Sequence, residues 1–210
     1  MNTKRYFIIV LALTAIFALS ISTAAAQSGN GNGGTGGGVG GGQGNGYQGG
    51  RNGDAPRGNT NATMNGGGFM LNLPPTSATV LPDDVIDLMI DGWTDEQHAY
   101  AVYQAVIDQF GALRPFSNIQ QSEAQHITAW ETLFARYGIA VPEIPTFDLP
   151  SFTIVSEACS VGAAAEIANF DLYDTMLATF EAYPDLLYVA QNLRDASEFS
   201  HLPAFENCAG

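Results

Sequence analysis

The chain has 210 residues, with 7 basic side chains against 21 acidic ones and a formal net charge of −14. Such an acidic surface repels nucleic acid and anionic membranes, so we expect neither as a partner. Of its 24 glycines, 19 lie between Ser28 and Gly68, which leaves about 130 residues of ordinary composition for one folded domain.

The first 26 residues have the pattern of a secretory signal peptide. Lys4 and Arg5 precede an apolar run over residues 6–21, and three alanines, residues 24–26, stand before Gln27. Small residues at this place suit signal peptidase, so we expect cleavage near Ala26 and a secreted or periplasmic protein. The alternative is an uncleaved membrane anchor, although the apolar run is short for a bilayer span. After cleavage, five arginines would face 21 acids, a formal charge of −16.

Residues 27–80 are predicted to be a disordered linker rich in glycine and asparagine. The segment contains few apolar side chains, and fixing a glycine backbone costs more entropy than fixing any other residue. A chain of this kind has no core to offset that cost and serves as a flexible tether. We expect folded structure over residues 81–210.

Four helical stretches and no strands are expected in the folded part. Periodic apolar positions and the placing of proline and glycine give their limits, and Gly92 is expected to interrupt the first helix. A proline-containing connector separates the second from the third. Helices without strands predict an all-α bundle. The four stretches are Pro82 to Phe110, Ser117 to Tyr137, Thr153 to Phe180, and Pro184 to at least His201.

Two of the three histidines lie three residues after a glutamate. The pairs are Glu123 with His126 and Glu198 with His201, and residues three apart on a helix share a face. On the second helix this face also carries Trp130, so both side chains should point into the bundle. Buried carboxylates need a cation, which indicates metal binding. Coincidence is the alternative, and Glu198 can instead pair on the surface with Arg194 one turn earlier.

Two further glutamates complete a set of six candidate metal ligands. Glu96 is in line with apolar positions of the first helix, although an acid in a first turn is also favoured on the surface. Glu166 stands alone among alanines in the third helix. Four glutamates would balance the charge of two divalent ions. The predicted ligands are Glu96, Glu123, His126, Glu166, Glu198 and His201.

Two tyrosines and the third histidine are not among the predicted ligands. Tyr103 and Tyr173 each follow a proposed ligand by seven residues, so they are expected either to donate hydrogen bonds to the ligands, to act as redox-active phenols, or simply to pack. His98, two residues after Glu96, should point away from the site to the surface.

These residues resemble the ferritin-like di-iron carboxylate proteins, which include ferritin and rubrerythrin. The phrase Glu96-x-x-Ala99-x-x-x-Tyr103 looks like the first helix of rubrerythrins. The segment from Phe116 to Ile119, leading to Ser122-Glu123-x-x-His126, resembles a ferritin-like family of uncharacterised function. The resemblance covers about Leu81 to Phe205. It implies a ferritin-like antiparallel four-helix bundle whose six ligands bind two iron ions, with manganese as the alternative.

The two cysteines are expected to form a disulfide. Cys159 lies seven residues before Glu166, and Cys208 lies seven residues after His201. In antiparallel helices both are therefore displaced from the ligands in the same direction, by about 10 Å. An exported chain favours a disulfide over two free thiols.

The function expected from these residues is redox chemistry at a dinuclear iron or manganese centre, with oxygen or peroxide as the oxidant, as in an oxidase or peroxidase. The alternative is a non-enzymatic module of the cell envelope or extracellular matrix that the metals stabilise, which the glycine-rich arm favours. Iron storage is less favoured, because a long arm and export both hinder cage assembly. An oligomer is compatible with the sequence.

Overall fold

The structure is a computed structural model that describes residues 68–210, so the predicted signal peptide and most of the predicted linker lie outside the described residues. The described residues form helices and no strand, which confirms the all-α prediction for this part of the chain. The elements are η2 (Gly68–Asn72), α2 (Asp83–Phe110), α3 (Phe116–Tyr137), α4 (Val155–Thr179), α5 (Pro184–Ala196), the π-helical η3 (Ser197–His201) and α6 (Leu202–Ala209).

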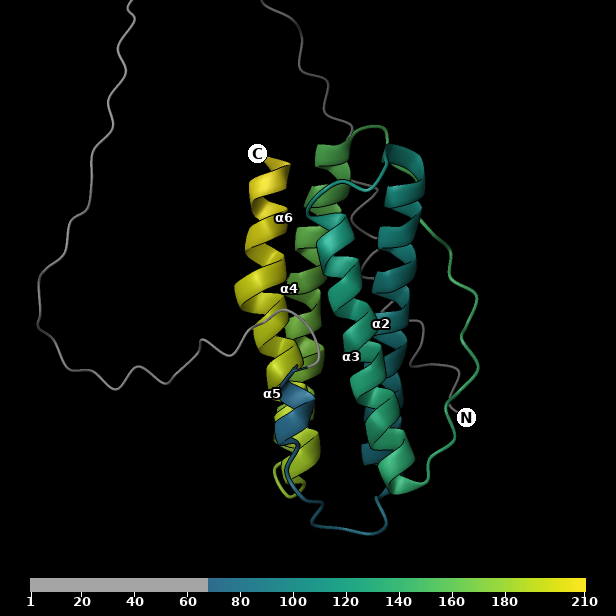
Figure 1. The fold of residues 1–210 in the computed structure, drawn as a ribbon, viewed down its shortest axis with the longest axis vertical. Helices are drawn as coiled ribbons and strands as arrows, with labels where there is room; N and C mark the ends of the chain where they lie inside the picture. Colours follow the sequence, from purple (N-terminus) through teal and green to yellow (C-terminus); the bar gives the residue numbers. More distant parts are fainter. Residues whose placement is uncertain (1–67) are drawn as a thin grey trace, which may run out of the picture.

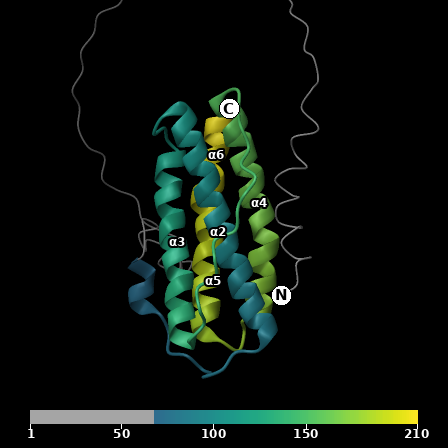
Figure 2. The same cartoon turned by 90° about the vertical axis from the view of Figure 1, so that its right-hand side faces the viewer.

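The long helices pack as a bundle of two hairpins (Figure 1). In the first hairpin α2 and α3 run antiparallel, and in the second α4 runs antiparallel to one continuous rod made of α5, η3 and α6. The connector over residues 138–154 travels the length of the bundle, so α3 and α4 point the same way (Figures 1 and 2). Four-helix bundles with one such long crossover are a known topology.

Two apolar clusters fill the bundle, one on each side of a polar layer. One contains Trp93, Trp130 and Tyr173, and the other contains Val102 and Phe116. Along each helix, the buried glutamates and histidines fall between the residues of these two clusters. A polar layer in the middle of an otherwise apolar bundle is unfavourable unless its charges are paired, so its carboxylates need a positively charged partner.

Gly92 does not interrupt the first helix, so that prediction was wrong. Helix α2 is continuous through it, and Gly92 is buried. A Cβ added at Gly92 would lie 2.7 Å from Met176 Cε and 2.8 Å from Trp130 Cζ2. The glycine therefore permits close packing of helices and is not a breaker here, because tertiary contacts outweigh its low helix propensity.

Contacts with the bundle begin before Leu81, the expected start of folded structure. The Tyr188 hydroxyl donates a hydrogen bond to the Phe69 carbonyl at 3.2 Å, and Ser77 Oγ donates one to the Ala182 carbonyl at 2.6 Å. The segment over residues 68–80 therefore lies against the end of the bundle where α5 begins.

The predicted disulfide is present. Cys159 in α4 and Cys208 in α6 are bonded, with their Cα atoms 5.7 Å apart. The bond links the start of α4 to the last turn of the chain. Within residues 68–210, the helices are all too short or too polar to cross a bilayer.

Candidate metal centre

Five of the six predicted ligands converge in the polar layer. They come from four elements: Glu96 from α2, Glu123 and His126 from α3, Glu166 from α4 and His201 from η3. Each has at most 5% of its surface exposed. The sequence prediction therefore placed these side chains correctly inside the bundle.

The first group of three joins α2 to α3. His126 Nδ1 lies 2.8 Å from Glu123 Oε2 and 3.2 Å from Glu96 Oε2. One ligand atom from each residue lies within 4.8 Å of the others. On the far side of the ring, His126 Nε2 is 3.3 Å from Ser122 Oγ, a contact that orients the imidazole.

The second group of three shares Glu123 with the first. His201 Nδ1 lies 3.3 Å from Glu123 Oε1 and 3.6 Å from Glu166 Oε1, and these ligand atoms also lie within 4.8 Å of one another. The two imidazoles are stacked, with ring centroids 5.5 Å apart. Both histidines present Nδ1 to the carboxylates, so the cluster has two adjoining positions for a cation with Glu123 common to both.

The residues present fit a metal site. His201 Nδ1 is a buried nitrogen without a hydrogen bond of good geometry. The three carboxylates of the cluster are buried, and the ion pairs they make are with the two histidines. Carboxylate oxygen with imidazole nitrogen is a donor set for iron, manganese or zinc. Buried like charges without a cation are strongly unfavourable, so this cluster can hold metal ions.

Two tyrosines hold the ligands reciprocally across α2 and α4. Tyr103 of α2 donates a hydrogen bond to Glu166 Oε1 of α4 at 3.0 Å, and Tyr173 of α4 donates one to Glu96 Oε1 of α2. Burial, and then the neighbouring carboxylates, raise the pKa of both phenols well above the usual value. Both stay protonated and act as donors, as the sequence suggested for one of their roles.

The acids and imidazoles of the cluster divide their protons unequally. Burial alone would raise the pKa of Glu96, but the charge and hydrogen bond of His126 prevail and lower it to about 2. Burial raises the pKa of Glu123 well above its usual range, although His201 opposes this. Burial disfavours a charged His201, yet Glu123 and Glu166 raise its pKa overall. Without metal, the cluster therefore retains protons that a metal ion must displace.

Glu198 does not join the cluster, contrary to its predicted role as a sixth ligand. It pairs with Arg194 one turn earlier, and its side chain is 34% exposed. The cause is the π-helical turn η3, which contains both Glu198 and His201. Pro203 lies two residues after His201 and has no N–H to donate to a carbonyl one turn back, which favours a wider turn before it. In a wider turn, residues three apart no longer share one face, so His201 points inward and Glu198 does not.

His98 is buried, so its predicted surface position was wrong. Only 5% of it is exposed, and its ring packs on Phe147 of the crossover connector with centroids 4.9 Å apart. Burial lowers the pKa of His98. The helix face of His98 was read correctly as different from that of Glu96, but a segment distant in sequence covers that face.

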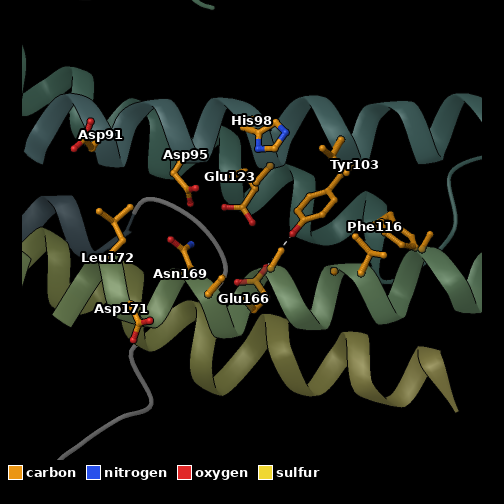
Figure 3. Close-up of a pocket in the computed structure, with 17 residues that line it drawn as sticks. Asp91, Asp95, His98, Tyr103, Phe116, Glu123, Glu166, Asn169, Asp171 and Leu172 are labelled. Carbon is orange, nitrogen blue, oxygen red and sulfur yellow. Dashed lines mark hydrogen bonds between the residues drawn. The ribbon is translucent and has the colours of Figure 1, made fainter. Parts of the chain in front are cut away.

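Two further polar residues border the cluster and were not predicted. Asp95 of α2 and Asn169 of α4 line a cavity together with Glu123 and Glu166, and Figure 3 shows them facing each other across it. Burial raises the pKa of Asp95 well above its usual range, as do the carboxylates of Glu96 and Glu166. The position of Asn169 three residues after Glu166 was a usable signal, whereas nothing in the local pattern singled out Asp95.

The fold and the site define the class of this protein: an all-α bundle with a buried glutamate and histidine cluster that can hold metal ions. Comparison with models of protein families, with curated proteins and with solved structures finds no match to the chain.

Proposed function

We propose that the protein binds two divalent metal ions at the five-residue cluster and, with iron bound, reacts with oxygen or peroxide. The observation that carries the proposal is the shared carboxylate of Glu123, which belongs to both groups of ligand atoms. A carboxylate between two imidazole-containing positions could serve as a ligand common to two metal ions.

The helix order supports a ferritin-like assignment. Ferritin-like bundles have one long crossover, with a glutamate from each of two helices and a Glu-x-x-His motif from each of the other two. Here the crossover lies between α3 and α4 (Figure 1), α2 and α4 supply Glu96 and Glu166, and α3 supplies a complete motif. The fourth rod supplies only His201.

Ligand type favours iron, with manganese as the second choice. Oxygen-rich sites with imidazoles suit these metals, whereas structural zinc sites are usually rich in cysteine. The two cysteines of this chain are used in the disulfide. Bound iron would supply reversible one-electron chemistry, which the protein side chains lack.

The side chains around the cluster have separable roles. Tyr103 and Tyr173 fix the orientation of Glu166 and Glu96, so these carboxylates are preorganised. Three ligand carboxylates leave one of the four positive charges of two divalent ions unbalanced, and the adjacent carboxyl of Asp95 can balance it. The apolar clusters close the bundle interior on both sides of the polar layer.

Small reactants have two approaches to the cluster. One cavity, of about 380 Å³, lies between α2 and α4 and reaches Glu123 and Glu166. A second, of about 480 Å³, is lined by residues of α3, η3, α6 and the loop before α3, and it reaches His201 and Ser122. Arg114, Asn118 and Asn207 lie in its wall and can bind a polar oxidant such as peroxide.

The direct test is to load the protein with ferrous iron without air, count the bound iron, and then admit oxygen or peroxide. We expect a charge-transfer absorption band and consumption of the oxidant. Zinc-loaded protein is the spectroscopic blank, and Glu181→Gln, at an exposed position, is the control variant. Bound iron with a silent spectrum and no oxidant consumed would remove the redox proposal.

A metal-stabilised, non-enzymatic module is the second candidate, and the repulsion among three buried carboxylates favours it. It predicts that removing the metal lowers the melting temperature sharply while the loaded protein consumes no oxidant. Export is part of both proposals and depends on residues 1–26 alone. Mass spectrometry of the protein produced in a secreting host tests export, because it shows whether residues 1–26 have been removed.

A further inference from the structure

A cavity of about 380 Å³ lies between α2 and α4 and adjoins the metal cluster. This volume falls within the range of about 300–1,000 Å³ that is typical of small-molecule sites. Figure 3 shows Phe116 at one end, Asp91 and Asp171 at the other, and Glu123 and Glu166 between them. The cavity therefore extends well beyond the two carboxylates that take part in the proposed metal site, which leaves most of its length to a larger molecule.

Most of the cavity wall is apolar. Small residues form it on α4, where Ala158, Gly162 and Ala165 line the cavity, and Ala99 and Val102 line it from α2. Water in such a space finds few hydrogen-bond partners, so an apolar molecule displaces it favourably. The wall therefore predicts a ligand with a hydrocarbon body.

One polar group at the cavity lacks a partner. Asn169 lines the cavity from α4, and its Oδ1 atom is buried and accepts no hydrogen bond from the described residues. A buried acceptor without a partner is unfavourable, so a ligand group that donates to Oδ1 is stabilised there. A hydroxyl group donates such a bond without bringing a charge into the apolar wall.

The charges of the wall favour a neutral ligand. Several acids line the cavity, and no lysine or arginine is among the described residues that line it. An anionic head group therefore has no partner and is repelled. An ammonium group loses its hydration in a largely apolar cavity, and the proposed metal ions already neutralise Glu123 and Glu166.

We propose that this cavity binds a small neutral alcohol with an aliphatic chain. The hydroxyl donates a hydrogen bond to Asn169 Oδ1, and the chain extends past Ala165 toward Val161 and Phe116. Eight positions of α4 separate Asn169 from Val161, which is about 12 Å of helix, and an octyl chain spans this distance. Binding requires neither iron nor an oxidant, so this inference goes beyond the proposed function and is tested separately from it.

The test is isothermal titration calorimetry on the full chain at neutral pH, both zinc-loaded and metal-free. The main probes are 1-octanol and its isomer dibutyl ether, which has the same atoms but no O–H to donate. Octane-1-sulfonate and octylammonium are the charged probes. We expect 1-octanol to bind, the ether to bind about tenfold more weakly, and the sulfonate not to bind. The metal-free arm compares the alcohol with the ether even where no zinc is retained.

Two outcomes of this titration would overturn the ligand class. Equal binding of 1-octanol and dibutyl ether would show that no hydroxyl is recognised. Octylammonium that binds zinc-loaded protein more tightly than 1-octanol does would show that the cavity selects a cation.

Variants on opposite walls locate the site. Ala165→Leu on α4 and Ala99→Leu on α2 should each weaken 1-octanol binding about tenfold by filling the cavity. Ala135→Leu, at an exposed position of α3, is the matched control and should bind as the wild type does. Circular dichroism and the melting temperature identify any variant that fails to fold, and the two walls provide independent readings. Binding that survives both cavity-filling variants would overturn the site.

A variant of the polar group tests the hydrogen bond. Asn169→Leu removes Oδ1 and should abolish the preference for 1-octanol over dibutyl ether, whereas Gln121→Leu, at an exposed position of α3, should retain it. The measured quantity is the ratio of two affinities, and a change in cavity volume alone affects both isomers. A preference that persists in Asn169→Leu would overturn the role of Asn169.

Discussion

Glu123 Oε1 lies 3.3 Å from His201 Nδ1, although 78 positions separate the two residues in sequence. The other oxygen of the same carboxylate lies 2.8 Å from His126 Nδ1. One side chain of α3 therefore connects an imidazole of its own helix to an imidazole of the last rod. This relationship makes Glu123 the residue on which both proposed metal positions depend.

Loss of Glu123 should remove both metal ions, whereas loss of Glu198 should not. Glu123→Gln keeps the shape of the side chain but takes away the shared carboxylate, and we expect metal affinity to fall about 100-fold or more. Glu198→Gln should retain the wild-type metal content, because Glu198 pairs with Arg194 outside the cluster. Metal analysis after dialysis measures both. Equal losses in the two variants would place Glu198 among the ligands.

Stability of the metal-free protein should decrease between about pH 5 and about pH 8. The pKa values of Glu123, Asp95 and His201 are raised in the folded state. Groups with raised pKa stabilise the fold below their unfolded pKa, and this contribution is lost as the pH rises through the folded pKa. Glu96, with its pKa lowered to about 2, is ionised in both states over this range and contributes no slope. His98, whose pKa burial lowers, acts in the opposite direction up to its unfolded pKa of about 6.5, so the decrease should be clearest above that pH.

Thermal melting of the metal-free protein at several pH values measures this dependence. Zinc binds the deprotonated ligands, so the increase in melting temperature that zinc causes should grow with pH. Glu123→Gln is the control variant, and its metal-free form should show a smaller slope. A metal-free melting temperature that stays constant or rises between about pH 6.5 and about pH 8 would contradict the retention of protons by these groups.

Most residues of the metal cluster could be predicted from their spacing along single helices. Residues three apart on an α-helix share a face, so Glu123 and His126 could be placed together without knowledge of the fold. The disulfide followed from matched offsets: Cys159 precedes Glu166 by the same number of residues as Cys208 follows His201. Such predictions succeed because they need only regular helices and their relative direction.

The predictions that were wrong share a different cause. Each concerns a residue whose position depends on an irregular turn or on a segment distant in sequence. The spacing of Glu198 and His201 suggested one face, but the π-helical turn before Pro203 separates the two side chains. The burial of His98 depends on Phe147, in a connector whose path local sequence does not specify. Glycine has a low helix propensity, so Gly92 was expected to interrupt the helix. It lies inside the helix because Trp130 and Met176 approach too closely to leave room for a Cβ.

Gly92→Ala should destabilise the protein, although alanine is the better helix former. An exposed helical glycine would gain about 1 kcal/mol from the substitution. At Gly92 the added methyl would lie 2.8 Å from the Trp130 ring, which is fully buried and cannot move aside freely. We expect a net loss of about 1–3 kcal/mol in the free energy of unfolding. Denaturant titration measures it, and a gain in stability would show that the interior has room here.

Asp185 should be the most sensitive acid outside the metal cluster. It is fully buried at the start of α5, its Oδ2 lies 2.9 Å from Arg136 Nη1, and the Tyr137 hydroxyl donates to its Oδ1 at 2.9 Å. Arg136 also donates to the carbonyl of Pro74. One carboxylate thus ties α5 to α3 and, through Arg136, to the segment before α2.

Replacing the buried Asp185 by alanine removes its ion pair with Arg136 and the acceptor of the Tyr137 hydroxyl, so we expect a loss of about 3 kcal/mol in the free energy of unfolding. Glu181→Ala, three residues before Pro184 and exposed, should change stability by no more than about 0.5 kcal/mol. Urea denaturation of both variants with metal removed isolates this network from the cluster. Hydrogen exchange should show faster opening of residues 68–80 in Asp185→Ala alone, and unchanged exchange there would mean that the apolar contacts of Phe69 hold that segment without the network.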